Sequence, residues 1–87
     1  MPIISKFFGI IIFMFWRDHN PPHFHAKYGD YEIIVNIETG EIIGNISRRV
    51  LDIIQEWRIL HKPELLANWH LAEENKSLNN IKPFDLD

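Results

Sequence analysis

Residues 23–36, HFHAKYGDYEIIVN, predict a β-hairpin that sets the fold of the chain. A two-residue loop with glycine first lies between two tyrosines, which is typical of a type II′ turn at Gly29-Asp30. Side chains alternate between the two faces of a strand, so one face is apolar and the other carries His23 and His25. We therefore expect both imidazoles to point away from the main core. The expected cross-strand pairs are Ala26 with Ile33 and Phe24 with Val35.

A four-stranded, mainly antiparallel sheet is predicted around this hairpin. The apolar run at residues 3–16 predicts a long first strand, in which Gly9 marks a bulge or bend. Two adjacent prolines make residues 17–22 a loop. Thr39-Gly40 can close a second tight hairpin. That hairpin pairs Ile37 with Ile42, Val35 with Gly44 and Ile33 with Ile46. The predicted strands are 3–16, 22–28, 31–38 and 41–46.

The apolar spacing changes after residue 46 from two to three or four, which indicates helix. Ser47 is a candidate N-cap, and Pro63 interrupts the helical pattern. Two helices are predicted on one face of the sheet, at about 47–61 and 63–75, and one bent helix stays open as the alternative. A tail at residues 76–87 follows, pinned by Ile81 and Phe84. The chain, residues 1–87, is thus expected to be a single α+β domain.

Composition narrows the classes of partner. The net charge of −3 argues against a general nucleic-acid or anionic-membrane surface, although a local basic patch leaves nucleic acid open. There is no cysteine and hence no disulfide. The apolar run at residues 7–16 is shorter than the roughly 20 residues of a membrane-spanning helix, and no small-residue cleavage site follows it. We expect a cytoplasmic protein without a membrane segment.

Several short motifs carry a resemblance to a known family. The most specific is Pro21-Pro22-His23-Phe24-His25, followed by Tyr28-Gly29. The others are Ile4-Ser5, Phe8-Gly9-Ile10, Gly40-Glu41, Gly44, Arg49, Glu56-Trp57, His61, Glu64-Leu65 and Asn68-Trp69. With these residues nearly the whole chain resembles the bacterial family called domain of unknown function 4160.

The resemblance implies a partner but no settled activity. Members of that family look like one half of compact two-gene units resembling toxin–antitoxin pairs, which implies a small protein partner encoded nearby. Which half is the toxin does not follow from the resemblance. Phe13 stands where many relatives carry a polar or basic side chain. We expect Phe13 and Phe15, with His23 and His25, to bind a protein partner or a second copy of the chain.

The favoured function is therefore a protein-interaction module, and an enzyme is the alternative. His19, His23 and His25 are the candidate catalytic and metal-binding residues. The latter two project from one strand face with Cβ atoms roughly 6–7 Å apart, which a divalent ion such as zinc can span. Asp18 or Glu32 would add an oxygen ligand. This pattern predicts a small metal-dependent or histidine-based hydrolase, while the simpler interpretation leaves the imidazoles hydrogen-bonded to Asn36 or to backbone.

A basic cluster at the predicted helix start offers a phosphate site. Ser47, Arg48 and Arg49 form it, since a helix N-terminus favours anions. In a nuclease version of the enzyme hypothesis, His23 or His25 takes a proton while one of these arginines holds the phosphate. Acidic residues follow on the same helix, so the arginines are equally placed to form solvated ion pairs.

Overall fold

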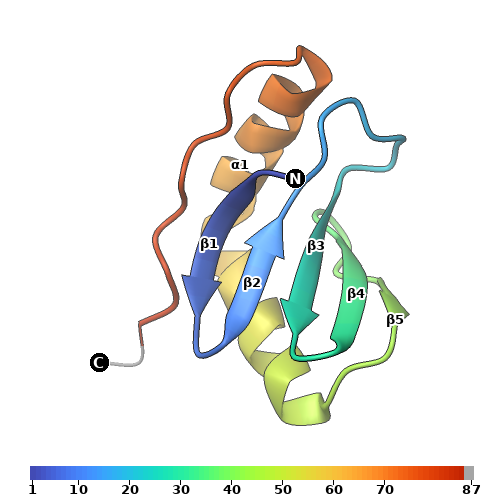
Figure 1. The fold of residues 1–87 in the computed structure, drawn as a ribbon, viewed down its shortest axis with the longest axis vertical. Helices are drawn as coiled ribbons and strands as arrows, with labels where there is room; N and C mark the ends of the chain where they lie inside the picture. Colours follow the sequence, from blue (N-terminus) through green and yellow to red (C-terminus); the bar gives the residue numbers. More distant parts are fainter. Residues whose placement is uncertain (86–87) are drawn as a thin grey trace.

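Across residues 1–85, which the computed structural model describes, the chain forms a five-stranded antiparallel sheet and one long helix behind it (Figure 1). The strands follow one another across the sheet in chain order. They are β1 (Ile3–Phe7), β2 (Ile10–Phe13), β3 (His23–Tyr28), β4 (Tyr31–Asn36) and β5 (Ile42–Gly44), and the helix is α1 (Arg48–Glu73). The predicted α+β class with an antiparallel sheet is confirmed, whereas the numbers of strands and helices differ from the prediction. The last two residues of the predicted tail lie outside the described residues.

The predicted first strand, 3–16, is a hairpin of two strands. Phe8 and Gly9 have φ values of +50° and +78°, as in a type I′ turn, and Phe7 pairs with Ile10. Glycine adopts positive φ without a steric penalty, so Gly9 marks a full reversal of the chain rather than a bend. The turn is hidden in the sequence because apolar residues continue on both sides of it. β2 then ends at Phe13, and the following loop spans residues 14–22.

The central hairpin is the predicted one. Phe24 pairs with Val35 and Ala26 with Ile33. Gly29 has a φ of +60° and Asp30 has no positive φ, which fits the type II′ turn.

The next hairpin has a longer loop than predicted. Val35 pairs with Ile42 and Ile33 with Gly44, so the three predicted pairs between these strands are wrong by two residues. The Asn36 side-chain oxygen accepts the N–H groups of residues 38 and 39, and this lengthens the turn. A shift of two residues keeps each side chain on its predicted face.

The two predicted helices are one bent helix. His61, two residues before Pro63, has non-helical angles (φ −116°, ψ 19°), because the proline has no N–H to continue the helix and its ring clashes with the carbonyl four residues earlier. The predicted N-cap is correct, since Ser47 Oγ accepts the N–H of Val50. Within the described residues, no helix combines the length and the apolar character needed to cross a bilayer.

The core lies between α1 and the apolar face of the sheet. Trp57 is fully buried and packs edge-on against Phe24. The indole N–H of Trp57 donates to the carbonyl of Lys82, which ties the C-terminal segment to the helix. Other core side chains are Ile4, Ile10, Ile12, Ala26, Ile33, Val35, Ile54, Leu65 and Trp69.

The C-terminal segment covers one edge of the sheet. Ile81 N–H donates to the Ile4 carbonyl over 2.8 Å, and the segment runs beside β1 in Figure 1. Ile81 and Phe84 are buried, as predicted for the pinned tail. The buried Asn68 amide donates to the Asn79 carbonyl and accepts the Asn79 N–H, each over 2.9 Å. The β1 edge is thereby covered.

Replacing Asn68 with alanine should detach this segment. Asn68→Ala leaves the backbone groups of Asn79 unpartnered, which should lower the free energy of unfolding by about 2–3 kcal/mol. Asn80→Ala, at an exposed position, is the matched control and should change it by less than about 0.5 kcal/mol. Urea unfolding followed by tryptophan fluorescence measures both. Equal effects of the two substitutions would contradict the role assigned to Asn68.

Candidate functional site

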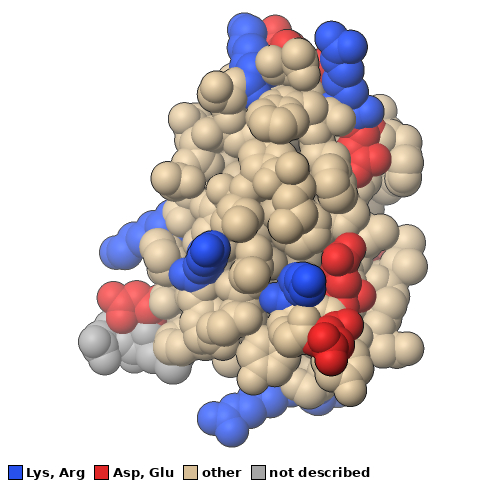
Figure 2. Space-filling model, viewed as in Figure 1, with Lys and Arg blue, Asp and Glu red and all other residues tan. Residues whose placement is uncertain are grey.

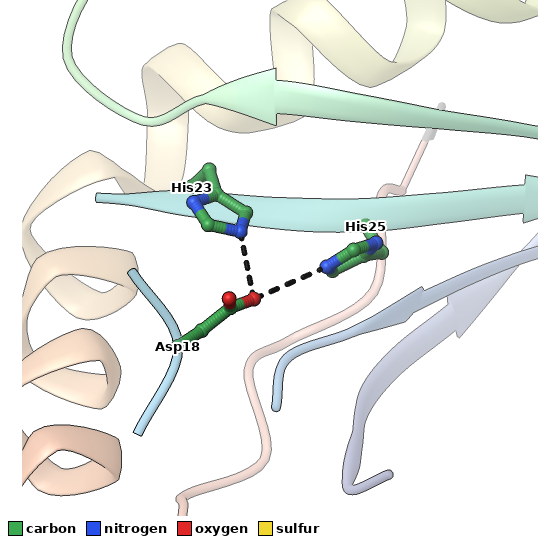
Figure 3. Close-up of side chains that lie close together, drawn as sticks. All are labelled: Asp18, His23 and His25. Carbon is green, nitrogen blue, oxygen red and sulfur yellow. Dashed lines mark hydrogen bonds and ion pairs between the residues drawn. The ribbon is translucent and has the colours of Figure 1, made fainter. Parts of the chain in front are cut away.

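The loop at residues 14–22 brings a carboxylate to the start of β3. Arg17 N–H donates to the carbonyl of Ala72 at the end of α1, and the Trp16 indole donates to the carbonyl of Lys76. These bonds hold the loop against the C-terminal end of the helix. Asp18 follows directly and points toward β3 (Figure 3).

Asp18, His23 and His25 form one compact cluster. Asp18 Oδ2 lies 2.9 Å from His23 Nε2 and 3.6 Å from His25 Nε2 (Figure 3). The side chains of the two histidines are only 4% and 9% exposed, and that of Asp18 is 19% exposed. One ligand atom from each residue lies within 4.8 Å of the others. The cluster is thus nearly closed, with its opening at the carboxylate.

Asp18 and His23 are each held by backbone as well. The second oxygen of Asp18, Oδ1, accepts the backbone N–H of His19 over 2.8 Å. His23 Nδ1 lies 2.7 Å from the Pro21 carbonyl oxygen and therefore donates to it. The imidazole of His23 is fixed at both nitrogens, with Nε2 aimed at Asp18.

His25 is enclosed by aromatic rings. Phe13 stacks on the imidazole at a centroid distance of 5.0 Å, and Phe15 meets it edge-on at 4.8 Å. Both ring nitrogens of His25 are buried without a hydrogen-bond partner among the described residues. Glu32 Oε2 lies 3.6 Å from Nδ1, beyond hydrogen-bonding distance. An unpartnered buried polar group costs about 1–3 kcal/mol, so the unmatched nitrogens call for an explanation.

Opposing effects act on the pKa of Asp18. Partial burial raises this pKa, but the His19 N–H and the imidazoles of His23 and His25 together outweigh burial and hold it below its ordinary value. Asp18 is therefore a carboxylate at neutral pH, and the cluster joins a negative oxygen to two imidazoles.

Comparison with known proteins shows a family match that includes all three residues of the cluster. The family model described as Domain of unknown function (DUF4160) matches residues 9–70. The chain belongs to this family. Asp18, His23 and His25 all lie within the matched span of DUF4160. No curated protein and no solved structure matches the chain.

The structure changes the predicted ligand set within the DUF4160 span. The side chain of His19 is 81% exposed, and its Nε2 lies 3.7 Å from Asp18 Oδ1, outside the cluster. Asp18, which the sequence offered only as one of two oxygen donors, takes the central position, and Glu32 lies beside His25. A carboxylate five residues before His23 was visible in the sequence. Its contact depends on the path of the loop, which local patterns do not determine.

His23 and His25 point to the predicted face of the sheet, but both are buried there. His23 and His25 lie on the face opposite Phe24, but the 14–22 loop and Phe13 cover them. Phe13 is itself buried, whereas Phe15 is 41% exposed. Of the four residues expected to meet a partner, Phe15 is therefore the one with substantial exposed surface. Of the two predicted partners of the imidazoles, Asn36 or backbone, the backbone is the one observed for His23, whose Nδ1 bonds to the Pro21 carbonyl while its Nε2 contacts Asp18.

The basic cluster lies far from the imidazoles. Arg48 Nε forms an exposed ion pair with Asp52 over 3.2 Å, the solvated pairing that the sequence allowed. Arg49 lines a hollow with Tyr28, at the opposite end of β3 from His23. Five residues of strand separate these ends by roughly 16 Å. The position of His23 therefore does not support the predicted nuclease arrangement, with imidazole and arginine on one phosphate.

The depressed pKa of Asp18 predicts a pH-dependent stability. Its contribution is present above the ordinary aspartate pKa and is lost as the pH falls through the lower pKa of the folded state. In metal-free buffer, Asp18→Asn should lower the free energy of unfolding by about 1–2 kcal/mol at pH 7 and by much less near pH 2. Urea unfolding at a series of pH values tests this.

Asp52→Asn is the control, because that carboxylate belongs to an exposed ion pair and should show little effect at any pH. A deficit of Asp18→Asn that stays constant from pH 7 to pH 2 would contradict the role given to the charged form.

Proposed function

We propose that this protein is the interaction component of a two-protein pair of the toxin–antitoxin type. Its partner is a small protein that binds the open face, defined as the face of the sheet opposite α1. The exposed apolar residues of this face are Ile3, Phe15 and Ile43, and the half-buried ones are Ile11 and Ile34. One observation carries the proposal: an apolar face left uncovered beside an unpaired strand edge.

Part of the open face is uncharged, although Lys6, Lys27 and Glu32 also lie on it. Figure 2 shows this side with a broad area free of Lys, Arg, Asp and Glu, and with charged side chains mainly around it. Ile43, at 69% exposure, is the most exposed isoleucine of the face. Apolar patches rimmed by charged groups are typical of protein-binding surfaces.

The two edges of the sheet differ in whether another segment covers them. The C-terminal segment bonds to β1 through Ile81 and Ile4, whereas no described strand pairs with β5 on its outer side. An edge strand presents unpaired backbone N–H and C=O groups to a further strand. A partner on the open face can therefore also extend along β5.

The chemistry of the surface favours a protein over a nucleic acid. The net charge is −3, and the open face carries Glu32 as well as Lys6 and Lys27. The resemblance of the family to two-gene units supports a partner encoded nearby. A second copy of this chain is the competing occupant, which the experiment below distinguishes.

Ile43→Lys should weaken binding of the protein encoded beside this one. Ile43 lies on the edge strand β5, where a charge placed in the apolar part of the proposed interface should raise Kd at least about tenfold, while the exposed position leaves folding intact. Co-expression with the tagged neighbour, followed by calorimetry on the purified pair, measures the change.

Ile59→Lys on α1 is the matched control, because Ile59 is similarly exposed at 65% and lies on the other side of the molecule. Absence of binding by the unmodified chain, or equal weakening by both substitutions, would contradict the proposal. Sedimentation of the chain alone provides the last check, since a dimer that Ile43→Lys disrupts would assign the open face to a second copy.

A further inference from the structure

Three donor atoms converge beside the start of β3 (Figure 3). Asp18 Oδ2 lies 2.9 Å and 3.6 Å from the Nε2 atoms of His23 and His25. Donor atoms bound to one ion at about 2.1 Å stand roughly 3–3.5 Å apart. The two separations from Asp18 are therefore close to those of a coordination site, and all three donor atoms lie within 4.8 Å of one another.

We propose that Asp18, His23 and His25 bind one divalent transition-metal ion, through Asp18 Oδ2 and the two Nε2 atoms. This inference goes beyond the proposed interaction function and does not depend on it. It replaces the three-histidine set expected from the sequence with two imidazoles and one carboxylate.

The unpartnered ring nitrogens of His25 support a metal site independently of the donor spacing. Its side chain is nine-tenths buried, its Nε2 points toward Asp18, and neither ring nitrogen has a hydrogen-bond partner (Figure 3). A bound ion would take the lone pair of Nε2 and so satisfy this buried atom. Nδ1 would then carry the proton and face Glu32, whose Oε2 lies 3.6 Å away, beyond hydrogen-bonding distance. The packing of Phe13 on the ring keeps it at this position.

The hydrogen bonds of His23 also fit an ion. Its Nδ1 faces the Pro21 carbonyl and its Nε2 faces the Asp18 carboxylate, and both of these oxygens only accept. Without an ion, keeping both contacts as hydrogen bonds requires one proton on Nδ1 and another on Nε2. With an ion at Nε2, the neutral ring donates from Nδ1 to Pro21 and binds the metal with its other nitrogen. Metal-bound histidines commonly donate their second N–H to a carbonyl or carboxylate in this way.

The carboxylate is oriented for the same role. Asp18 Oδ1 is engaged by the His19 N–H, which leaves Oδ2 for the ion. Two of the three ligands thus have a hydrogen-bond partner at the atom that does not bind: the His19 N–H for Asp18 and the Pro21 carbonyl for His23. Such outer contacts fix ligand orientation and raise metal affinity.

The donor set selects the class of ion. Imidazole nitrogen suits Zn²⁺, Fe²⁺, Co²⁺ and Ni²⁺, whereas Ca²⁺ and Mg²⁺ prefer oxygen ligands. Three protein ligands leave a coordination position for water, and the partly exposed Asp18 gives access to the cluster. An open position of this kind is what the hydrolase hypothesis would require.

Metal titration tests the inference directly. The full chain, freed of metal with a chelator, should bind one Zn²⁺ per molecule by calorimetry, and Co²⁺ should give visible absorption bands of a nitrogen- and oxygen-ligated ion. Asp18→Asn and His25→Gln should each weaken Zn²⁺ binding at least tenfold. His19→Ala, at the exposed neighbouring imidazole, and Ile43→Lys, on the proposed partner surface, should leave it unchanged.

NMR of the unmodified chain provides a test that does not depend on whether the variants at buried residues fold. Zn²⁺ should shift the imidazole resonances of His23 and His25 and leave those of His61 and His70 in place. Unmoved resonances of His23 and His25, or loss of binding in His19→Ala with retention in Asp18→Asn, would overturn the inference.

Discussion

The contact of the Asp18 carboxylate with the imidazoles of His23 and His25 organises the end of the sheet where the 14–22 loop meets the C-terminal half of α1. Two buried imidazoles need a polar partner, and the 14–22 loop provides one only by folding back to the start of β3. The same loop brings Phe15 edge-on to His25, so it also closes the cluster against water. The open face is thereby divided into a covered part around the histidines and an uncovered apolar part that extends to Ile43. The proposed metal site lies in the covered part, and the proposed partner surface is the uncovered part.

Local signals predicted the elements that local interactions determine. The Gly29 turn, the pairing of Phe24 with Val35 and the Ser47 N-cap follow from residues close together in sequence, and all three predictions are confirmed. The turn at Gly9 was missed because uninterrupted apolar residues resemble one buried strand. The β5 register was missed because the Asn36 side chain, rather than a two-residue turn, sets the loop length. That error of two residues left the side chains of β5 on their predicted face, and the direction of the histidines was correct because the pairing of β3 with β4 was correct.

The sequence predicted which face of the sheet carries the candidate site, but not which residues form it. Strand alternation places His23 and His25 on one face, yet their burial depends on the 14–22 loop, whose path is fixed by distant bonds such as Arg17 to Ala72. The same dependence makes Asp18 a ligand candidate and leaves His19 exposed. The basic cluster shows the opposite error, because sequence chemistry suggested a joint phosphate site while the start of α1 lies at the other end of β3. Membership of a family without a described activity leaves these contacts as the basis for both proposals.

Phe15 connects the two proposals, since it covers His25 and also contributes exposed surface to the open face. An ion bound to Asp18 would hold the loop that carries this ring. The central claim is that Asp18, His23 and His25 form one site, and anomalous diffraction from crystals grown with Co²⁺ tests it most directly. A single strong peak is expected at about 2.1 Å from Asp18 Oδ2 and from both Nε2 atoms. Peaks only at exposed imidazoles such as His19 or His70, with the cluster free of cobalt, would contradict it.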